Sequence, residues 1–102
     1  MERRRLVVTA QALHDLLADH NYIAQFNPVA ARRFLDDING KMISLARYGI
    51  TGVPRSFAPN LRAFPYRERC IYFIVDDNKM YVLRVLHGHQ DISADHFKQE
   101  AN

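Results

Sequence analysis

Arginine and histidine side chains near the end of the chain are the residues best suited to chemistry. The segment 82–91 reads VLRVLHGHQD and contains Arg84, His87 and His89. A guanidinium can hold a phosphate or a carboxylate through two parallel hydrogen bonds, and an imidazole exchanges protons near neutral pH. If the protein cleaves RNA, these three residues are its candidate catalytic groups, because Arg84 can stabilise the phosphate and a histidine can move the 2′-OH proton.

The same histidines raise the question of a metal site. His87 and His89 are alternate residues that can place two imidazoles on one side of a strand end, and Asp91 and His96 are the nearest groups that could complete the site. Two histidines without a clear third ligand are more often hydrogen-bonded surface groups, so we predict no metal and no cofactor. Arg84 can likewise have a structural role instead of a catalytic one, in an ion pair with a local carboxylate such as Asp91.

The composition fits one ordinary globular domain over residues 1–102. The chain is 48% hydrophobic and 25% charged, and Cys70 is its single cysteine, so it can form no intramolecular disulfide. Its formal charge is +3, and arginine supplies eleven of its fourteen basic residues, which favours an acidic partner. No apolar stretch approaches the roughly 20 residues of a membrane span, and the apolar run that follows Met1 to Arg5 is too short for a signal peptide, so we expect a cytoplasmic protein without membrane contact.

Two amphipathic helices are predicted in the first half of the chain, after a short β-prone run at 6–8. Thr9 can cap a helix over 10–26, and Asn27-Pro28 is a typical start for a second helix. The short break between them implies an antiparallel hairpin. Apolar residues at helical spacing predict the faces that pack on the core, and these include Leu13, Leu17, Phe34, Leu35, Ile38 and Leu45.

Three β-like runs follow, at 61–64, 70–75 and 80–86, so the predicted order is β-α-α-β-β-β. The Gly- and Pro-rich stretch 48–60 predicts an irregular connection, and the polar tail 90–102 predicts one helical turn that begins at Ser93. In the last two runs the apolar residues fall on both faces of the strand. A helix hairpin covers one face only, so the other face, which holds Arg84, must be closed by the chain's own loop and tail or by another protein.

Several segments resemble the ParE branch of the ParE/RelE toxin superfamily. They are the opening NPVAA of the second helix at 27–31, LRAFP at 61–65, the strand 70–75 and LRVLHGHQD at 83–91. Together they span roughly residues 6–91 in the order that the family has. The resemblance implies an α+β, RelE-like fold in which a short N-terminal strand and the two-helix hairpin pack on a mainly antiparallel sheet.

The resemblance also implies a function in a toxin-antitoxin pair. ParE toxins are known as inhibitors of DNA gyrase, whereas their RelE-like relatives cleave messenger RNA on the ribosome. The lysines common in RelE sites have no counterpart near 61–69, and the tyrosine expected after the last strand is absent. We therefore expect a non-enzymatic gyrase inhibitor, with a ribosome-dependent endoribonuclease as the alternative and a family member that has lost toxicity as a third possibility.

The expected partner is a ParD-like antitoxin that wraps the toxin in a hetero-oligomer, so that contact with DNA is only indirect, through the antitoxin or gyrase. Apolar strand residues and an arginine-rich surface predict where the antitoxin binds. The antitoxin-binding candidates are Arg62, Arg67, Arg69, Met80, Val82, Arg84 and Leu86. His87 and His89 are the candidates for binding the target.

Overall fold

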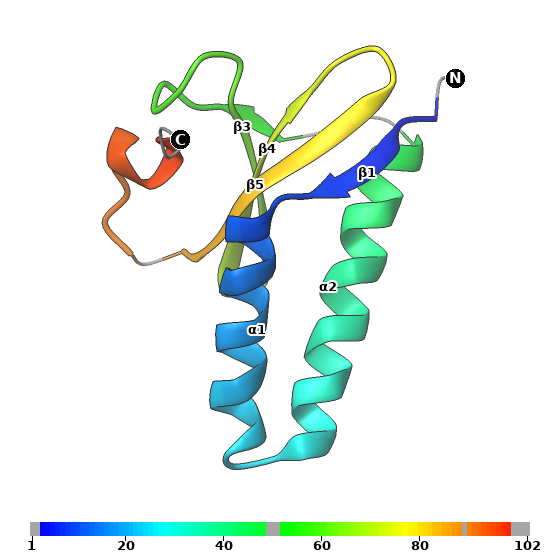
Figure 1. The fold of residues 1–102 in the computed structure, drawn as a ribbon, viewed down its shortest axis with the longest axis vertical. Helices are drawn as coiled ribbons and strands as arrows, with labels where there is room; N and C mark the ends of the chain where they lie inside the picture. The colour runs from blue at the N-terminus through cyan, green and yellow to red at the C-terminus, as the bar shows by residue number, and fades with distance from the viewer. Residues whose placement is uncertain (1–2, 49–51, 89, 99–102) are drawn as a thin grey trace.

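A computed structural model describes residues 3–48, 52–88 and 90–98, and in it two antiparallel helices pack on one face of a five-stranded sheet (Figure 1). The strand order is β1-β5-β4-β3-β2, with β1 parallel to β5 and the other pairs antiparallel. This arrangement confirms the α+β fold predicted from the sequence. Among the described residues, no helix is long and apolar enough to cross a membrane.

The two helices begin at the capping residues that the sequence predicts, after a short first strand. Strand β1 (Arg5–Val8) leads into α1 (Ala10–Ala24), whose N-cap Thr9 accepts a hydrogen bond on Oγ1 from the Ala12 amide at 3.2 Å. Asn27 Oδ1 accepts in the same way from the Ala30 amide at 3.0 Å and begins α2 (Pro28–Tyr48). The predicted first helix was slightly too long, since residues 25–26 form a turn.

The second half forms β2 (Val53–Pro54), β3 (Arg62–Tyr66), β4 (Arg69–Val75), β5 (Lys79–His87) and the 3₁₀ turn η1 (Ala94–Phe97). The sequence did not predict β2, because two residues that include a proline show no strand periodicity. Gly52 leads into it with φ 110°, and a Cβ there would lie 2.6 Å from the Ala63 carbonyl oxygen. Only glycine fits this close approach of β2 to β3.

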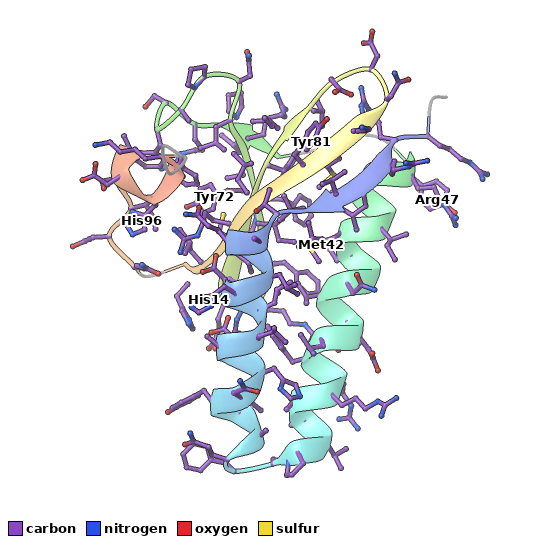
Figure 2. All side chains as sticks on the ribbon, in the orientation of Figure 1. His14, Met42, Arg47, Tyr72, Tyr81 and His96 are labelled. Atoms are coloured by element: carbon purple, nitrogen blue, oxygen red, sulfur yellow. The ribbon has the colours of Figure 1, made fainter. Side chains whose placement is uncertain are left out.

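The main core lies between the helices and the sheet, and one predicted part of it is wrong. Ile38 and Met42 of α2 are each 1% exposed, and Figure 2 shows Met42 between the two helices. From α1, however, Ala12 and Leu16 are buried, whereas Leu13 and Leu17 remain 49% and 44% exposed. Each residue of a helix is turned by about 100° from the one before, so the neighbours of the buried residues point away from the sheet.

A bulge in β5 divides the apolar residues of this strand between the two faces of the sheet. The pairing changes from Val82 with Phe73 to Arg84 with Tyr72, which leaves Leu83 as an extra residue. Met80, Val82 and Val85 therefore pack against the helices, whereas Leu86 belongs to the cluster on the other face. The simple alternation read from the sequence, which placed Met80, Val82 and Leu86 on one face, is wrong.

The second face of the sheet is covered by the chain's own loop and tail. A smaller cluster of buried residues lies there, formed by Leu61, Ala63, Cys70, Tyr72 and Leu86. Phe57 and Ala58 from the loop and Ile92 and Phe97 from the tail pack against it. The Phe97 ring lies 5.0 Å from the Tyr72 ring and 6.0 Å from the Phe57 ring, measured between centroids. The sequence allowed either the chain's own loop and tail or another protein to cover this face, and the structure shows the loop and tail there.

Candidate functional site

Three of the predicted basic residues, Arg69, Arg84 and His87, lie where α1 packs beside the free edge of β5. Strand β1 pairs with β5 only as far as Val8 with Val82, so the next part of that edge has no neighbouring strand. Helix α1 takes its place, and the Asp15 carboxylate accepts a hydrogen bond from the Val85 amide at 3.0 Å. A helical carboxylate thus satisfies a sheet-edge donor that would otherwise be unpaired.

Arg84 is bound on both sides of its guanidinium. Its Nε and Nη2 donate to the two oxygens of Asp15, each at 2.8 Å, and its Nη1 donates to the His96 carbonyl at 3.0 Å. The Arg84 side chain is only 20% exposed and the Asp15 side chain only 10%. The hydrogen bonds that Arg84 donates to the Asp15 carboxylate raise the pKa of Arg84 above its ordinary value. The sequence left open a structural role for Arg84, in an ion pair with a carboxylate such as Asp91. Arg84 does form an ion pair, but with Asp15 of α1.

A second carboxylate, one helical turn further along α1, holds two more of the predicted residues. Asp19 Oδ2 accepts from Nε of Arg69 at 2.9 Å, and its Oδ1 lies 3.3 Å from Nε2 of His87. The Arg69 guanidinium also lies 4.4 Å from the centre of the Phe34 ring, as in a cation–π contact. The His87 side chain is 56% exposed, whereas His89 lies outside the described residues.

The other two predicted arginines lie apart from this edge. Arg62 donates from Nη2 to the Gly52 carbonyl at 3.0 Å, and its buried Nε has no partner among the described residues. Arg67 sits in the turn between β3 and β4 with φ 58°, and its Nη1 lies 3.3 Å from Asp37. The Arg67 side chain is 66% exposed, so its guanidinium is available to a partner.

The three apolar candidates for antitoxin binding are inside the protein. Met80 and Val82 are 0% exposed and Leu86 is 4% exposed. As the protein stands, an antitoxin cannot touch these side chains unless the helices or the tail move. The sequence left open whether the chain's own loop and tail or another protein closes the second face, and the antitoxin was placed there, whereas the loop and tail cover it.

An open pocket of about 600 Å³ adjoins the Asp15–Arg84 pair. It lies between the start of α1, β5 and η1, and Figure 2 shows His14 projecting from α1 on this side of the molecule. Its lining is Thr9, Ala10, Gln11, His14, Asp15, Leu83, Arg84 and Phe97. Sequence reasoning missed Asp15, Asp19 and His14, because acidic and polar residues at helical spacing look like a solvated helix face.

This arrangement determines what the edge can do chemically. A phosphate could bind the Nε–Nη2 side of Arg84 only by displacing the Asp15 carboxylate, which already occupies that side with good geometry. His87 in turn is next to a carboxylate rather than next to Arg84. Within residues 3–48, 52–88 and 90–98, no cluster of three or more His, Cys, Asp or Glu residues is placed to bind a metal ion.

Comparison with known proteins identifies what the chain is similar to. A family model described as the ParE toxin of the type II toxin-antitoxin system, parDE, matches residues 6–92. No curated protein sequence gives a significant match. The fold is similar to that of a solved chromosomal ParDE TA system from P. aeruginosa, with 22% sequence identity, a TM-score of 0.72, and coverage of 82% of this chain and 95% of that one.

A second solved structure with a similar fold is the YoeB dimer from Staphylococcus aureus. Its sequence identity is 19% and its TM-score 0.57, over 86% of this chain and 100% of that one. At these identities the two structures support the fold alone.

Proposed function

The chain belongs to the ParE toxin family of type II toxin-antitoxin systems, and from this premise we propose that it inhibits DNA gyrase by binding rather than by cutting a nucleic acid. A gyrase target is typical of the family. Binding requires a complementary surface, whereas cleavage of RNA requires a free cation for the phosphate and a group to move a proton.

The observation that carries this proposal is the closed pair of Asp15 and Arg84. A ribonuclease site would need Arg84 to meet the developing phosphate charge, yet its Nε and Nη2 are both held at 2.8 Å by Asp15. Replacing that carboxylate with a phosphate would leave Asp15 unpaired next to β5, which is costly for a side chain that is 10% exposed. The geometry supports a structural role for Arg84.

We also propose neutralisation by a ParD-like antitoxin, on the exposed side of the helix hairpin. Leu13 and Leu17 lie one turn apart on α1 and are 49% and 44% exposed, which is the i, i+4 spacing that a partner helix recognises. The exposed surface of Leu13 and Leu17 replaces the buried strand residues as the site of antitoxin binding.

One comparison tests the proposal. Purified protein is added to a gyrase supercoiling reaction and to a translating ribosome extract, and in each assay Arg84→Ala and His87→Ala accompany the wild type. We expect inhibition of supercoiling and intact messenger RNA in the extract. Cuts at codon boundaries that disappear in His87→Ala, whose side chain is largely exposed and whose loss should not unfold the protein, would favour the ribonuclease alternative.

A further inference from the structure

Three large apolar side chains are exposed together where the two helices meet. Tyr22, Phe26 and Val29 are 65%, 74% and 68% exposed. Tyr22 is in the last turn of α1, Phe26 in the connection and Val29 in the first turn of α2, and this connection is at the end of the hairpin that points away from the sheet (Figure 1). We call this surface the hairpin tip. Exposed apolar groups that lie close together are a mark of interaction surfaces, whereas isolated ones are ordinary.

The hairpin tip is held in a fixed shape. The Tyr22 and Phe26 rings meet edge to face, with centroids 5.5 Å apart. The amides of Phe26 and Asn27 donate to the Ile23 carbonyl at 3.0 and 2.9 Å, and Asn27 caps the following helix. A partner that binds these rings would therefore order little that is not already ordered, which reduces the entropic cost of binding.

The charges nearest the hairpin tip on α2 are positive, and acidic residues follow one turn further along, where Asp36 and Asp37 line the same surface hollow as Val29, Arg32 and Arg33. Between Asp19 and Asp36 the sequence contains no acidic residue, whereas Arg32 and Arg33 are both exposed. No acidic side chain lies in the first turn of α2, so the positive end of the helix dipole adds to the two guanidinium groups. Among the ion pairs within the described part of the chain, none involves Arg32 or Arg33. Both are thus available to carboxylates of a partner.

We propose that the hairpin tip is the surface by which this protein binds its target, and that the target offers an apolar pocket rimmed with carboxylates. The inference rests on the proposed function, in that the target is a protein that the toxin inhibits. Burial of the Tyr22 and Phe26 rings would supply most of the binding energy, because exposed aromatic anchors commonly dominate interfaces. The two arginines would orient the approach and meet the acidic rim.

A protein fits this surface better than a nucleic acid does. Stacking on bases requires open aromatic faces, whereas the Tyr22 and Phe26 rings stand at 65° to each other and are in mutual contact. Two arginines supply few phosphate contacts, and the aliphatic Val29 gains nothing from a sugar-phosphate backbone. The apolar part of the hairpin tip is thus explained by a protein partner alone.

The hairpin tip is separate from the surface proposed for the antitoxin. Leu13 and Tyr22 are nine residues apart, which is about two and a half turns at 3.6 residues per turn. They therefore lie on opposite sides of α1. Substitutions at the hairpin tip can weaken target binding without weakening antitoxin binding, and the two effects can be measured independently.

The test uses Phe26→Ser and the double variant Arg32→Glu/Arg33→Glu. Tyr48→Ser is the matched control, because Tyr48 is 60% exposed at the opposite end of α2. Thermal unfolding of all three variants should match the wild type, since the side chains are exposed. We expect each hairpin-tip variant to need about tenfold more protein to inhibit gyrase supercoiling, as for an interface anchor. They should also arrest cell growth less, while Tyr48→Ser behaves as the wild type.

Several results would overturn the inference. Unchanged growth arrest and gyrase inhibition by Phe26→Ser would do so. So would hairpin-tip variants that stay toxic but escape the antitoxin encoded beside the toxin, which would assign the hairpin tip to the antitoxin. Binding to a DNA duplex that is lost in Arg32→Glu/Arg33→Glu but kept in Phe26→Ser would indicate a nucleic acid partner instead.

The inference and the proposed function fail in different ways. If the wild type arrests growth but leaves gyrase active, the proposed target is wrong, whereas loss of growth arrest in the hairpin-tip variants still supports the inferred surface. If the wild type inhibits gyrase and the hairpin-tip variants inhibit it equally, the surface is wrong and the target stands. A wild-type protein with neither effect would overturn both.

Discussion

The Asp15 carboxylate on α1 and the Arg84 guanidinium on β5 meet side by side, 69 residues apart in the sequence, through two hydrogen bonds of 2.8 Å. The same carboxylate accepts from the Val85 amide, and Arg84 also donates to the His96 carbonyl. Asp15 thus links α1 to the edge of the sheet, and Arg84 extends the link to the tail that covers the second face. Stability and the position of the tail both depend on this pair.

Loss of the Asp15 charge should destabilise the protein. Asp15→Asn keeps the size of the side chain but leaves Arg84 without its counter-charge and allows only one oxygen to accept. We expect the free energy of unfolding to fall by about 2 kcal/mol, the usual range for hydrogen bonds to charged groups. Urea unfolding measures this loss of free energy. The control is Asp95→Asn, whose exposed pair with Lys98 should contribute nothing measurable, and equal stability of both variants would contradict the structural role of Asp15.

Ile38 and Leu13 were both predicted to lie in the core, but their replacement by alanine should change the free energy of unfolding by different amounts. Ile38→Ala removes a side chain that is 1% exposed and should lower the free energy of unfolding by roughly 2 to 5 kcal/mol. Leu13→Ala removes one that is 49% exposed and should change it by less than about 0.5 kcal/mol. Equal losses, measured by urea unfolding, would mean that Leu13 is in the core as the sequence analysis expected.

Local signals in the sequence predicted the helices and the longer strands well. Thr9 and Asn27 begin α1 and α2 as expected, because capping depends on a few neighbouring residues. The choice of Leu13 and Leu17 as buried residues of α1 failed, because Ala12 and Leu16 define one possible apolar face and Leu13 and Leu17 another. Only the position of the sheet decides between these two faces.

The remaining errors come from contacts between distant parts of the chain. The bulge at Leu83 depends on how β5 pairs with β4, so an alternating pattern cannot reveal it. The roles of Arg84, Arg69 and His87 in binding stay predictions, and the carboxylates that hold these residues, Asp15 and Asp19, were not identified from the sequence. A carboxylate that will meet an arginine 69 residues away looks the same in sequence as one that faces water.

The turn between β4 and β5 should make stability sensitive to acid through Asp76. Its carboxylate accepts from the amides of Asn78 at 2.8 Å and Lys79 at 2.7 Å, which lowers the pKa of Asp76 below its ordinary value of 3.8. The folded state therefore favours the carboxylate, so this contribution to stability is complete above the ordinary pKa and is lost as pH falls through the folded one. It is a contribution present at neutral pH and absent in strong acid.

Asp76→Ala isolates that contribution, because the variant has no carboxylate to titrate. We expect the wild type to be the more stable protein at neutral pH, and the difference in urea midpoint to shrink below about pH 4, near the ordinary pKa of Asp. Measuring the difference between the two proteins cancels the titration of the other acidic groups. A difference that stays constant down to about pH 2 would show that the turn does not depend on the ionised form.

Cys70 provides a direct probe of the tail that covers the second face. It is the single cysteine, it is 8% exposed, and burial raises the pKa of its thiol. Thiols react as thiolates, so a buried cysteine with a raised pKa should be modified slowly by a disulfide reagent at pH 8. The ring of Phe97 packs on Tyr72 in the same cluster as Cys70, and its removal should open this cover.

Phe97→Ala should therefore speed the modification of Cys70 by about tenfold or more, if opening the tail costs roughly 1.4 kcal/mol less than in the wild type. Phe26→Ala, which removes an exposed ring from the hairpin tip, should leave the rate unchanged. Global unfolding would also expose Cys70, so Ile38→Ala serves as the second control, because it weakens the core on the opposite face. If Phe97→Ala reacts faster than Ile38→Ala while being the more stable of the two, the tail opens locally. If it reacts no faster than the wild type, Phe97 does not protect this face, and the cover must depend on Phe57 and the loop.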